Sequence, residues 1–140
     1  MKPYTFFDHT ADVLYEAYGK SFPEALENAA KALFQTIADL KLVGTSKKVT
    51  ISETALSESE LAAFVLSDLV AERDAQGLFF RSFAVTRFAE TKDGFVLQGV
   101  ARGAPMSAKA GLLDVKAVTH HETKAFQKNG TWTVRVLLDI

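Results

Sequence analysis

Two carboxylates and one imidazole lie within five consecutive residues near the N-terminus, in the segment Asp8-His9-Thr10-Ala11-Asp12. Carboxylate and hydroxyl oxygens are the ligands that hard cations such as Ca²⁺, Mg²⁺ and Mn²⁺ prefer, so this segment is a candidate metal-binding element. An extended backbone would place Asp8, Thr10 and Asp12 on one side and His9 on the other. Two carboxylates are fewer ligands than such a cation usually takes, and the spacing alone favours hydrogen bonds within a turn.

The last residues of the chain, Leu137-Leu138-Asp139-Ile140, form a second candidate element. A strand is expected to run to the chain end, which brings the side chain of Asp139 close to the terminal carboxylate of Ile140. Such a pair could complete an oxygen site begun elsewhere in the chain. A frayed and solvated end is the usual alternative, but the aliphatic strand indicates an end that is held in place.

A third cluster is the segment from Lys116 to His121, with the sequence Lys-Ala-Val-Thr-His-His. If residues 116–126 form one strand, as their composition suggests, Lys116 and His120 share one face and His121 lies on the other. Adjacent histidines on a strand cannot bind one ion unless the strand bulges, and no third zinc ligand is evident. The pattern therefore favours one hydrogen-bonded histidine and one solvated histidine over a zinc site.

Two helices are predicted to help position these segments, and each begins with a capping box. The boxes are Ser21-Phe22-Pro23-Glu24 and Ser57-Glu58-Ser59-Glu60. In each box the serine oxygen can accept from the backbone N–H three residues later. Apolar residues then recur at helical spacing in both segments, to about residue 37 in the first and to about residue 71 or 72 in the second. Each apolar stripe must be covered by a sheet or by another helix.

The rest of the chain is rich in strand signals. The turns Lys92-Asp93-Gly94 and Lys128-Asn129-Gly130 predict hairpins. Residues 42–46 and 103–111 are expected to form loops. The expected strands are residues 13–18, 48–52, 78–89, 95–100, 116–126 and 131–138. Together these features predict a single α+β domain over residues 1–140, with mostly antiparallel sheets and two amphipathic helices packed on them.

The composition excludes several classes of function. The chain has 140 residues, enough for one domain, and its 48% hydrophobic and 24% charged residues are ordinary for a soluble globular protein. It has no cysteine, which excludes disulfides, thiolate zinc sites and iron–sulfur clusters. A formal net charge of −1 is not the basic excess typical of proteins that bind nucleic acids on their own. No signal peptide or membrane-spanning run is visible, and the cytoplasm is the expected location.

Several of these segments together resemble one known family. The segment Phe7–Val13, then Gly19 with the capped helix after it, then Lys116–His121, and finally Asp139-Ile140 are similar in order and spacing to archease over essentially the whole chain. The resemblance implies a small accessory protein of the RtcB-type RNA-splicing ligase, which joins RNA ends in tRNA splicing and RNA repair. Such a protein promotes guanylylation of the ligase at its active-site histidine, with GTP and divalent metal, and is not itself a ligase.

The resemblance also implies site residues and partners. Asp12, Asp139 and Ile140 correspond to the family's metal site, and Lys116 corresponds to its functional lysine. His9 and Asp8 match the motif as further functional positions. Ca²⁺ is the expected metal, with Mg²⁺ or Mn²⁺ as alternatives; three oxygen groups could hold one such cation, with water completing the shell. RNA would be contacted through the ligase rather than directly, and the protein would be a monomer or a weak oligomer with no membrane partner.

The chain departs from the family pattern at three places. Ala104 follows Gly103 where the family usually has glutamate, and Ala110 or a neighbour stands where the following loop usually has histidine. His120 replaces the tyrosine of the family's Thr-Tyr-His segment. If the missing glutamate contributes to the metal site or to the ligase contact, metal affinity or partner identity would differ in this chain.

Two other functions compete with the accessory role. A chaperone-like modulator of a tRNA-modifying enzyme, such as a methyltransferase, would act through exposed apolar surface and would tolerate loss of Asp12 and Asp139. A standalone metal-dependent hydrolase would need a general base near the metal, for which His9 is the nearby candidate. The hydrolase ranks last because the common nucleotide-binding, metalloprotease and serine-hydrolase motifs are absent.

Overall fold

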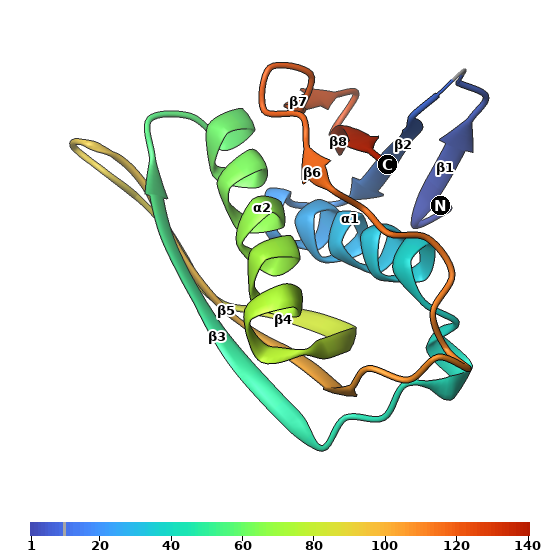
Figure 1. The fold of residues 1–140 in the computed structure, drawn as a ribbon. Coiled ribbons are helices and arrows are strands. Elements are labelled where there is room, and N and C mark those ends of the chain that lie inside the picture. The colour runs from blue at the N-terminus through green and yellow to red at the C-terminus, as the bar shows by residue number, and fades with distance from the viewer. Residues whose placement is uncertain (10) are drawn as a thin grey trace.

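The computed structural model describes residues 1–9 and 11–140 of the chain. Within these residues, two α-helices lie between two antiparallel sheets (Figure 1). The helices are α1 (Phe22–Ile37) and α2 (Glu58–Gln76), and a short 3₁₀ helix, η1 (Leu40–Leu42), follows α1. The strands are β1 (Tyr4–Phe7), β2 (Val13–Gly19), β3 (Lys47–Ala55), β4 (Leu78–Thr91), β5 (Gly94–Pro105), β6 (Ala117–Val118), β7 (Lys124–Lys128) and β8 (Thr131–Asp139). The predicted single α+β domain is confirmed.

Both predicted serine caps are formed. The Ser21 hydroxyl accepts from the backbone N–H of Glu24 at 3.3 Å, and the Glu24 carboxylate accepts from the N–H of Lys20 at 3.0 Å. The Ser57 hydroxyl accepts from the N–H of Glu60 at 3.1 Å. Helix α2 continues beyond its predicted end, because no glycine interrupts it before Gly77, which caps it in the left-handed conformation with φ of 65°.

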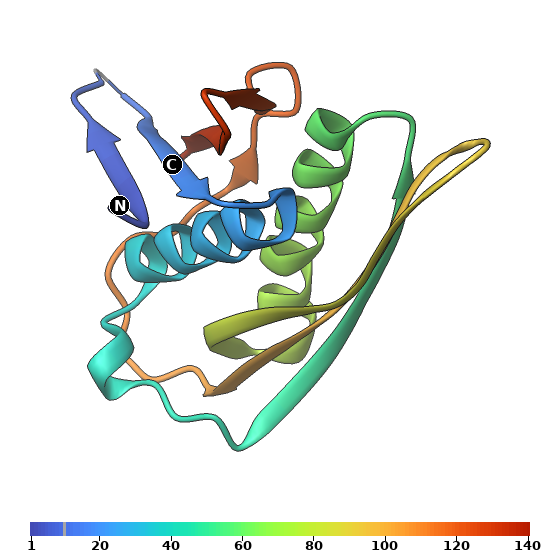
Figure 2. The same cartoon turned by 180° about the vertical axis from the view of Figure 1, so that it is seen from behind.

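The two sheets cover different faces of the helix pair. One sheet has the order β1-β2-β8-β6, and β7 also pairs with β8; we call it the β2–β8 sheet. The other has the order β3-β5-β4; we call it the β3–β5–β4 sheet. Figure 2, seen from behind, shows both helices between the two sheets. Both predicted hairpin turns are present, one joining β4 to β5 and the other, with Asn129 and Gly130 at positive φ, joining β7 to β8.

The structure differs from the sequence-based expectations at three places. The sequence does not predict strand β1, since four residues give too short a pattern. The expected strand over residues 116–126 is wrong: it divides into β6 and β7, and a turn at residues 120–122 separates them. The turn forms because the hydroxyl of Thr123 donates to the carbonyl of Thr119 at 2.9 Å. The expected loop over 103–111 begins later, since β5 extends to Pro105.

The core reaches the ends of three neighbouring strands. Leu138 of β8 is fully buried and pairs with Val13 of β2 on one side and with Val118 of β6 on the other. Farther along, Tyr15 is also fully buried, and its hydroxyl donates to the carbonyl of Ala29 at 2.8 Å. Burial raises the pKa of the Tyr15 phenol, which therefore stays protonated. This apolar row fixes the strand ends on which the predicted site residues lie.

Neither α-helix in the described part of the chain combines the length and apolar character needed to cross a membrane.

Candidate functional site

Three neighbouring strands bring segments from both ends of the chain together. Strand β8 lies between β2 and β6, and the pairs Val13–Leu138 and Ala117–Asp139 fix its end against them. Asp12 directly precedes Val13, so Asp12 and Asp139 lie at the same end of two adjacent strands. The backbone N–H of Lys116 donates to the carbonyl of Asp139 at 2.8 Å. The register therefore places Asp12, Asp139 and Lys116 in one region, although 104 residues or more separate Asp12 from the other two.

The other motif residues lie in the connection between β1 and β2. Asp8 and His9 are exposed there, directly after the pairing of Phe7 with Leu14. The expected extended segment is not continuous, because the chain bends at Ala11 and Asp12 to reverse direction between the two strands. Thr10, which is expected to share a side with Asp8 and Asp12, lies outside the described residues. The structure thus brings Asp8 and His9 to the same connection as Asp12 without pairing them with Asp139.

The donor groups of this region are carboxylates. Asp12 is half-buried and Asp139 is exposed, so both are open to solvent. Carboxylate oxygens fit a hard cation such as Ca²⁺, Mg²⁺ or Mn²⁺ better than they fit zinc. No group of three or more Asp, Glu, His or Cys side chains in the described chain is arranged to hold a metal. A metal at this place would therefore need an oxygen ligand besides the two side chains, and the Ile140 carboxylate remains the predicted one.

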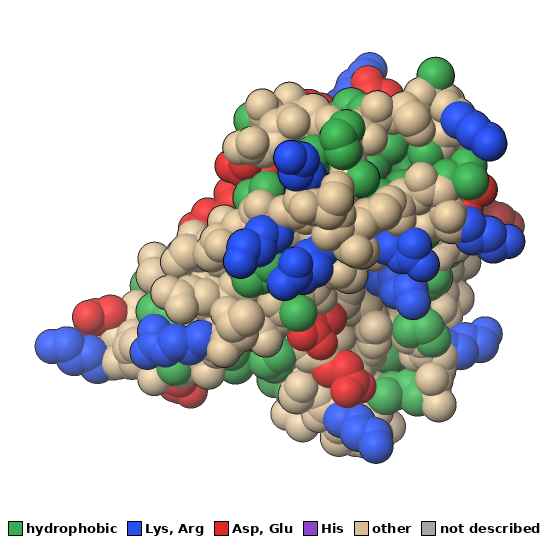
Figure 3. Space-filling model, turned by 90° about the horizontal axis from the view of Figure 1, so that it is seen from below, with side chains coloured by type: hydrophobic (Ala, Val, Ile, Leu, Met, Phe, Trp, Pro, Cys, Tyr) green, Lys and Arg blue, Asp and Glu red, His purple; other side chains and the backbone are tan. Residues whose placement is uncertain are grey.

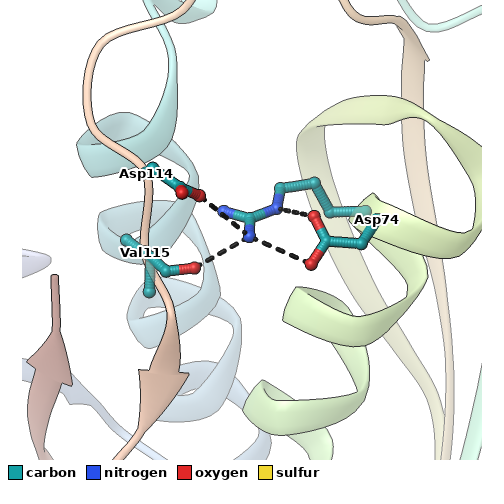
Figure 4. Close-up of polar contacts among 4 residues, drawn as sticks. Asp74, Asp114 and Val115 are labelled. Carbon is teal, nitrogen blue, oxygen red and sulfur yellow. Dashed lines mark hydrogen bonds and ion pairs between the residues drawn. The ribbon is translucent and has the colours of Figure 1, made fainter.

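A buried arginine holds the segment that leads to Lys116. The Arg73 side chain on α2 is 5% exposed, and its guanidinium donates to the backbone carbonyl of Val115 at 2.8 Å (Figure 4). It also pairs with Asp74 at 2.9 Å and with Asp114 at 3.4 Å. Sequence reasoning missed Arg73, which occupies a helix position that could equally have been solvated. The available signal was an arginine among buried residues of the stripe, four positions after Leu69.

The two adjacent histidines do not form a metal site. His120 and His121 are both exposed and lie in the turn after β6, not on opposite faces of a strand. The Nε2 atom of His120 lies 2.7 Å from the Ser67 hydroxyl, and its ring packs against Phe64 with centroids 5.7 Å apart. The expectation of one hydrogen-bonded histidine is met by His120. This hydrogen bond lies at the surface, because the turn places both histidines away from the core.

The departure at Ala104 lies far from the candidate metal residues. Ala104 is on β5 and pairs with Phe79 of β4. Asp139 lies on the other sheet, and Figures 1 and 2 both show the C-terminus and the end of β5 on opposite sides of the helix pair. The absence of a glutamate at position 104 therefore leaves the surroundings of Asp12 and Asp139 unchanged.

A carboxyl pair, Asp68 of α2 and Glu53 of β3, lies away from this site. Burial raises the pKa of Asp68 to about 7, and a hydrogen bond with Glu53 and the charges of Glu53 and Glu72 act in the same direction. The folded protein therefore holds this proton more tightly than the unfolded chain does. The resulting stabilisation is complete below the ordinary pKa of 3.8 and is lost as the pH rises to about 7.

This pair predicts a measurable pH effect. We expect Asp68→Asn to raise the free energy of unfolding by about 1 kcal/mol at about pH 8, because an amide carries no charge beside Glu53. The gain should shrink at about pH 5, where the wild-type carboxyl is protonated. Urea unfolding at both pH values measures the difference, with Glu122→Gln as the matched control in an exposed turn. Equal stability of Asp68→Asn and wild type at about pH 8 would contradict the assignment.

Comparison with known proteins places the chain among a defined set of relatives. The model of the Archease protein family (MTH1598/TM1083) matches residues 4–140. A relative named "Protein archease" from Methanothermobacter thermautotrophicus is 34% identical over 141 residues, which cover 100% of both chains. A relative of the same name from Sulfolobus acidocaldarius is 32% identical over 142 residues, again covering 100% of both chains.

Two solved structures resemble the fold. The solution structure of Methanobacterium thermoautotrophicum protein 1598 has a TM-score of 0.86 and 32% identity, and the match covers 100% of both chains. The crystal structure of an archease from Thermotoga maritima, described there as a possible chaperone, has a TM-score of 0.62. That match covers 96% of this chain and 94% of the other, and at 24% identity it supports the fold alone.

Proposed function

The chain belongs to the archease family, and we propose that it is a non-catalytic accessory protein of an RtcB-type RNA ligase. In this proposal it promotes guanylylation of the ligase and so allows repeated turnover in tRNA splicing or RNA repair. The observation that carries the proposal is the strand register that brings Asp12, Asp139 and Lys116 to one exposed region. The region is open to a partner, since Asp139 and Lys116 are exposed.

The same residues support a metal role within this function. Asp12, Asp139 and the Ile140 carboxylate would hold a divalent cation, Ca²⁺ first and Mg²⁺ or Mn²⁺ as alternatives. When bound, the cation would supply positive charge for phosphate groups of the nucleotide or of the ligase site. Lys116 lies beside Asp139 and carries a charge of the same sign as the cation, so it would neutralise phosphate charge or pair with an acidic partner group. Asp8 and His9 would contribute to the partner contact from the adjacent connection.

Loss of the Asp139 carboxylate is expected to abolish the accessory effect. We expect Asp139→Ala to reduce stimulation of the ligase about tenfold or more, because removal of a metal ligand should cost at least as much as removal of a residue supporting one. The measurement is multiple-turnover RNA ligation with GTP and Mn²⁺ by an RtcB-type ligase. Asp93→Ala, which removes an exposed carboxylate from the β4–β5 turn, is the matched control. Full stimulation by Asp139→Ala would contradict the metal role.

A second arm tests the predicted ligand at Ile140. A Gly-Ser extension after Ile140 keeps every side chain but moves the terminal carboxylate away. If that carboxylate is a ligand, the extended protein should bind Ca²⁺ as weakly as Asp139→Ala does in calorimetry. Wild-type Ca²⁺ affinity in the extended protein would remove Ile140 from the ligand set while leaving Asp12 and Asp139 in it.

An exposed apolar surface supports a second candidate function. Leu112 and Leu113 are 62% and 45% exposed, and both line a hollow of about 300 Å³ that also includes Met106. Such a surface would suit the chaperone-like modulator of a tRNA-modifying enzyme, such as a methyltransferase. The double variant Leu112→Ser/Leu113→Ser should then lose protection of a methyltransferase against aggregation, whereas Asp139→Ala should keep it. Turnover by the purified protein alone, with no ligase present, would instead favour the standalone metal-dependent hydrolase.

A further inference from the structure

The outer face of the β3–β5–β4 sheet carries positive charge without negative charge. Residues paired directly across antiparallel strands share a face, so the register defines four rows that cross all three strands on this side. The rows are Lys48–Arg102–Ser82, Thr50–Val100–Ala84, Ser52–Gln98–Arg87 and Thr54–Val96–Ala89. In this sheet, all of whose residues are described, these rows contain no Asp or Glu. They combine three cationic side chains with hydroxyl and amide groups.

This face is open to solvent. The opposite face of the same sheet carries the buried residues Ile51, Leu97 and Phe83 and packs against the two helices. The cationic residues Lys48, Arg87 and Arg102 are all exposed. Seen from below, the surface of the molecule shows several Lys and Arg side chains close together, with Asp and Glu side chains beside them (Figure 3). A large partner could therefore approach the rows without displacing a helix.

A hollow continues the cationic surface at the edge of β4. It has a volume of about 480 Å³, shares Ser82 with the outer rows, and is lined by the cationic residues Lys31, Lys41 and Arg81. Its acidic lining residue, Glu27, is already engaged, because its carboxylate accepts from the backbone N–H of Val85 at 2.8 Å. The outer rows and the hollow share Ser82 and together contain six cationic side chains, of which Arg81 also donates to the backbone carbonyl of Val43 at 2.9 Å.

We propose that this surface, the outer rows with the hollow, binds the phosphate backbone of an RNA stem. Lys and Arg side chains, together with Ser, Thr and Gln, are the groups that contact phosphates and sugars in nucleic-acid complexes. The lysines and serines of this surface fit a protein interface poorly, because such interfaces are depleted in both residue types. No aromatic residue lies in the four outer rows of this fully described sheet, and Phe79, which pairs with Ala104 farther along the same side, packs against the core, so the rows offer no platform for stacking single-stranded bases.

The shape of the face favours RNA over DNA. A-form RNA has a wide, shallow minor groove that displays 2′-hydroxyls, which short Ser and Thr side chains on an open sheet could reach. The proposal departs from the expectation that RNA is reached through the ligase alone. It rests on the β3–β5–β4 sheet and not on the region of Asp12 and Asp139, so the two proposals can be tested independently.

Binding to a labelled RNA hairpin tests the proposal. Fluorescence anisotropy of the wild-type protein should give a Kd of about 10⁻⁶ to 10⁻⁴ M near physiological salt, the range of sequence-independent binding. The affinity should fall as salt is raised, because each phosphate contact releases counterions. A single strand of equal length and a DNA duplex should bind more weakly. Absence of binding to the hairpin at low salt would overturn the proposal.

A charge-matched pair of variants locates the contact. Lys48→Gln/Arg87→Gln/Arg102→Gln should lower hairpin affinity at low salt about tenfold or more and reduce the salt slope by about two to three. The control removes three exposed lysines from elsewhere in the chain and has the same net charge: Lys20→Gln/Lys124→Gln/Lys128→Gln. We expect the control to bind nearly as wild type. Equal losses in both variants would show a general charge effect and overturn the proposal.

Two further measurements distinguish RNA binding at this surface from RNA binding at the strand ends and from binding of an acidic protein. Asp139→Ala should keep full hairpin affinity whether or not it still stimulates a ligase. A loss of hairpin affinity in Asp139→Ala as large as in the triple variant would place the RNA at the strand-end region and overturn the proposal.

Poly-glutamate should not compete with the hairpin at equal charge concentration. Equal competition would assign the surface to an acidic protein and would also overturn the proposal. Circular dichroism checks that each variant is folded, and the wild-type salt dependence provides a test that needs no variant.

Discussion

Replacing Arg73 with alanine is expected to lower the free energy of unfolding by about 3 kcal/mol. The guanidinium donates to the carbonyl of Val115, a residue that is itself fully buried. Removal of the donor leaves that carbonyl without this partner inside the protein, and also removes the packing of a side chain that is 5% exposed. The two carboxylate partners, Asp74 and Asp114, are 66% and 86% exposed, so their own ion pairs contribute little.

The Arg73→Ala variant should lose more stability in the segment near Val115 than in the protein as a whole. The segment from Met106 to Lys116 should exchange its amide hydrogens faster, because Arg73 holds the end nearest β6. Urea unfolding and hydrogen exchange measure the two effects. Asp114→Asn is the control, with an expected change below about 0.5 kcal/mol. If Arg73→Ala and Asp114→Asn lower the free energy of unfolding equally, the hydrogen bond from Arg73 to the Val115 carbonyl is not the contact that stabilises the protein.

Arg73 also marks the limit of what local sequence patterns predict. The helices and hairpins could be predicted because their signals are local: a serine three residues before a glutamate, or Asn129 before Gly130. Such signals require only that the chain favours one conformation over a few residues. The bond from Arg73 to Val115 joins residues 42 positions apart, and no local pattern specifies which exposed or buried partner a helical arginine takes.

The strand errors have the same origin. The composition of residues 116–126 predicts one strand, yet Thr119 and Thr123 bond to each other and close a turn inside it. Threonine favours strands, and it also makes side-chain bonds that compete with them. Strand β1 escapes prediction because its four residues gain stability from pairing with β2, which the chain segment alone does not reveal.

The candidate site was predictable in its residues and not in its positions. Asp12 and Asp139 could be singled out as carboxylates near strand ends, and the family resemblance joined them with Lys116. The register supplied what neither source contained, namely that β8 lies between β2 and β6. The cationic rows were invisible in the sequence for a related reason. Lys48, Arg87 and Arg102 come from three strands, and the overall charge of −1 hides their gathering on one face.

Replacing Leu138 with alanine is expected to lower the free energy of unfolding by about 3 kcal/mol, the usual cost of truncating a fully buried leucine. Leu138 differs from other core leucines because its partners Val13 and Val118 lie in β2 and β6, the strands that Asp12 and Lys116 directly precede. The cavity left by the truncated side chain would loosen the adjacent ends of β2, β6 and β8 together. Asp12, Asp139 and Lys116 would then lose their fixed spacing, and Ca²⁺ affinity should fall along with stability, with no ligand removed.

Three matched variants separate this coupling from loss of stability alone. Leu138→Met keeps most of the volume and should cost less than about 1.5 kcal/mol, with metal affinity near wild type. Leu56→Ala truncates a leucine that is 77% exposed and should change neither quantity. Leu66→Ala removes a fully buried leucine from the middle of α2 and should destabilise the protein as Leu138→Ala does while keeping Ca²⁺ affinity. Equal Ca²⁺ affinity in Leu138→Ala and Leu66→Ala would mean that metal binding at the strand ends does not depend on this apolar row.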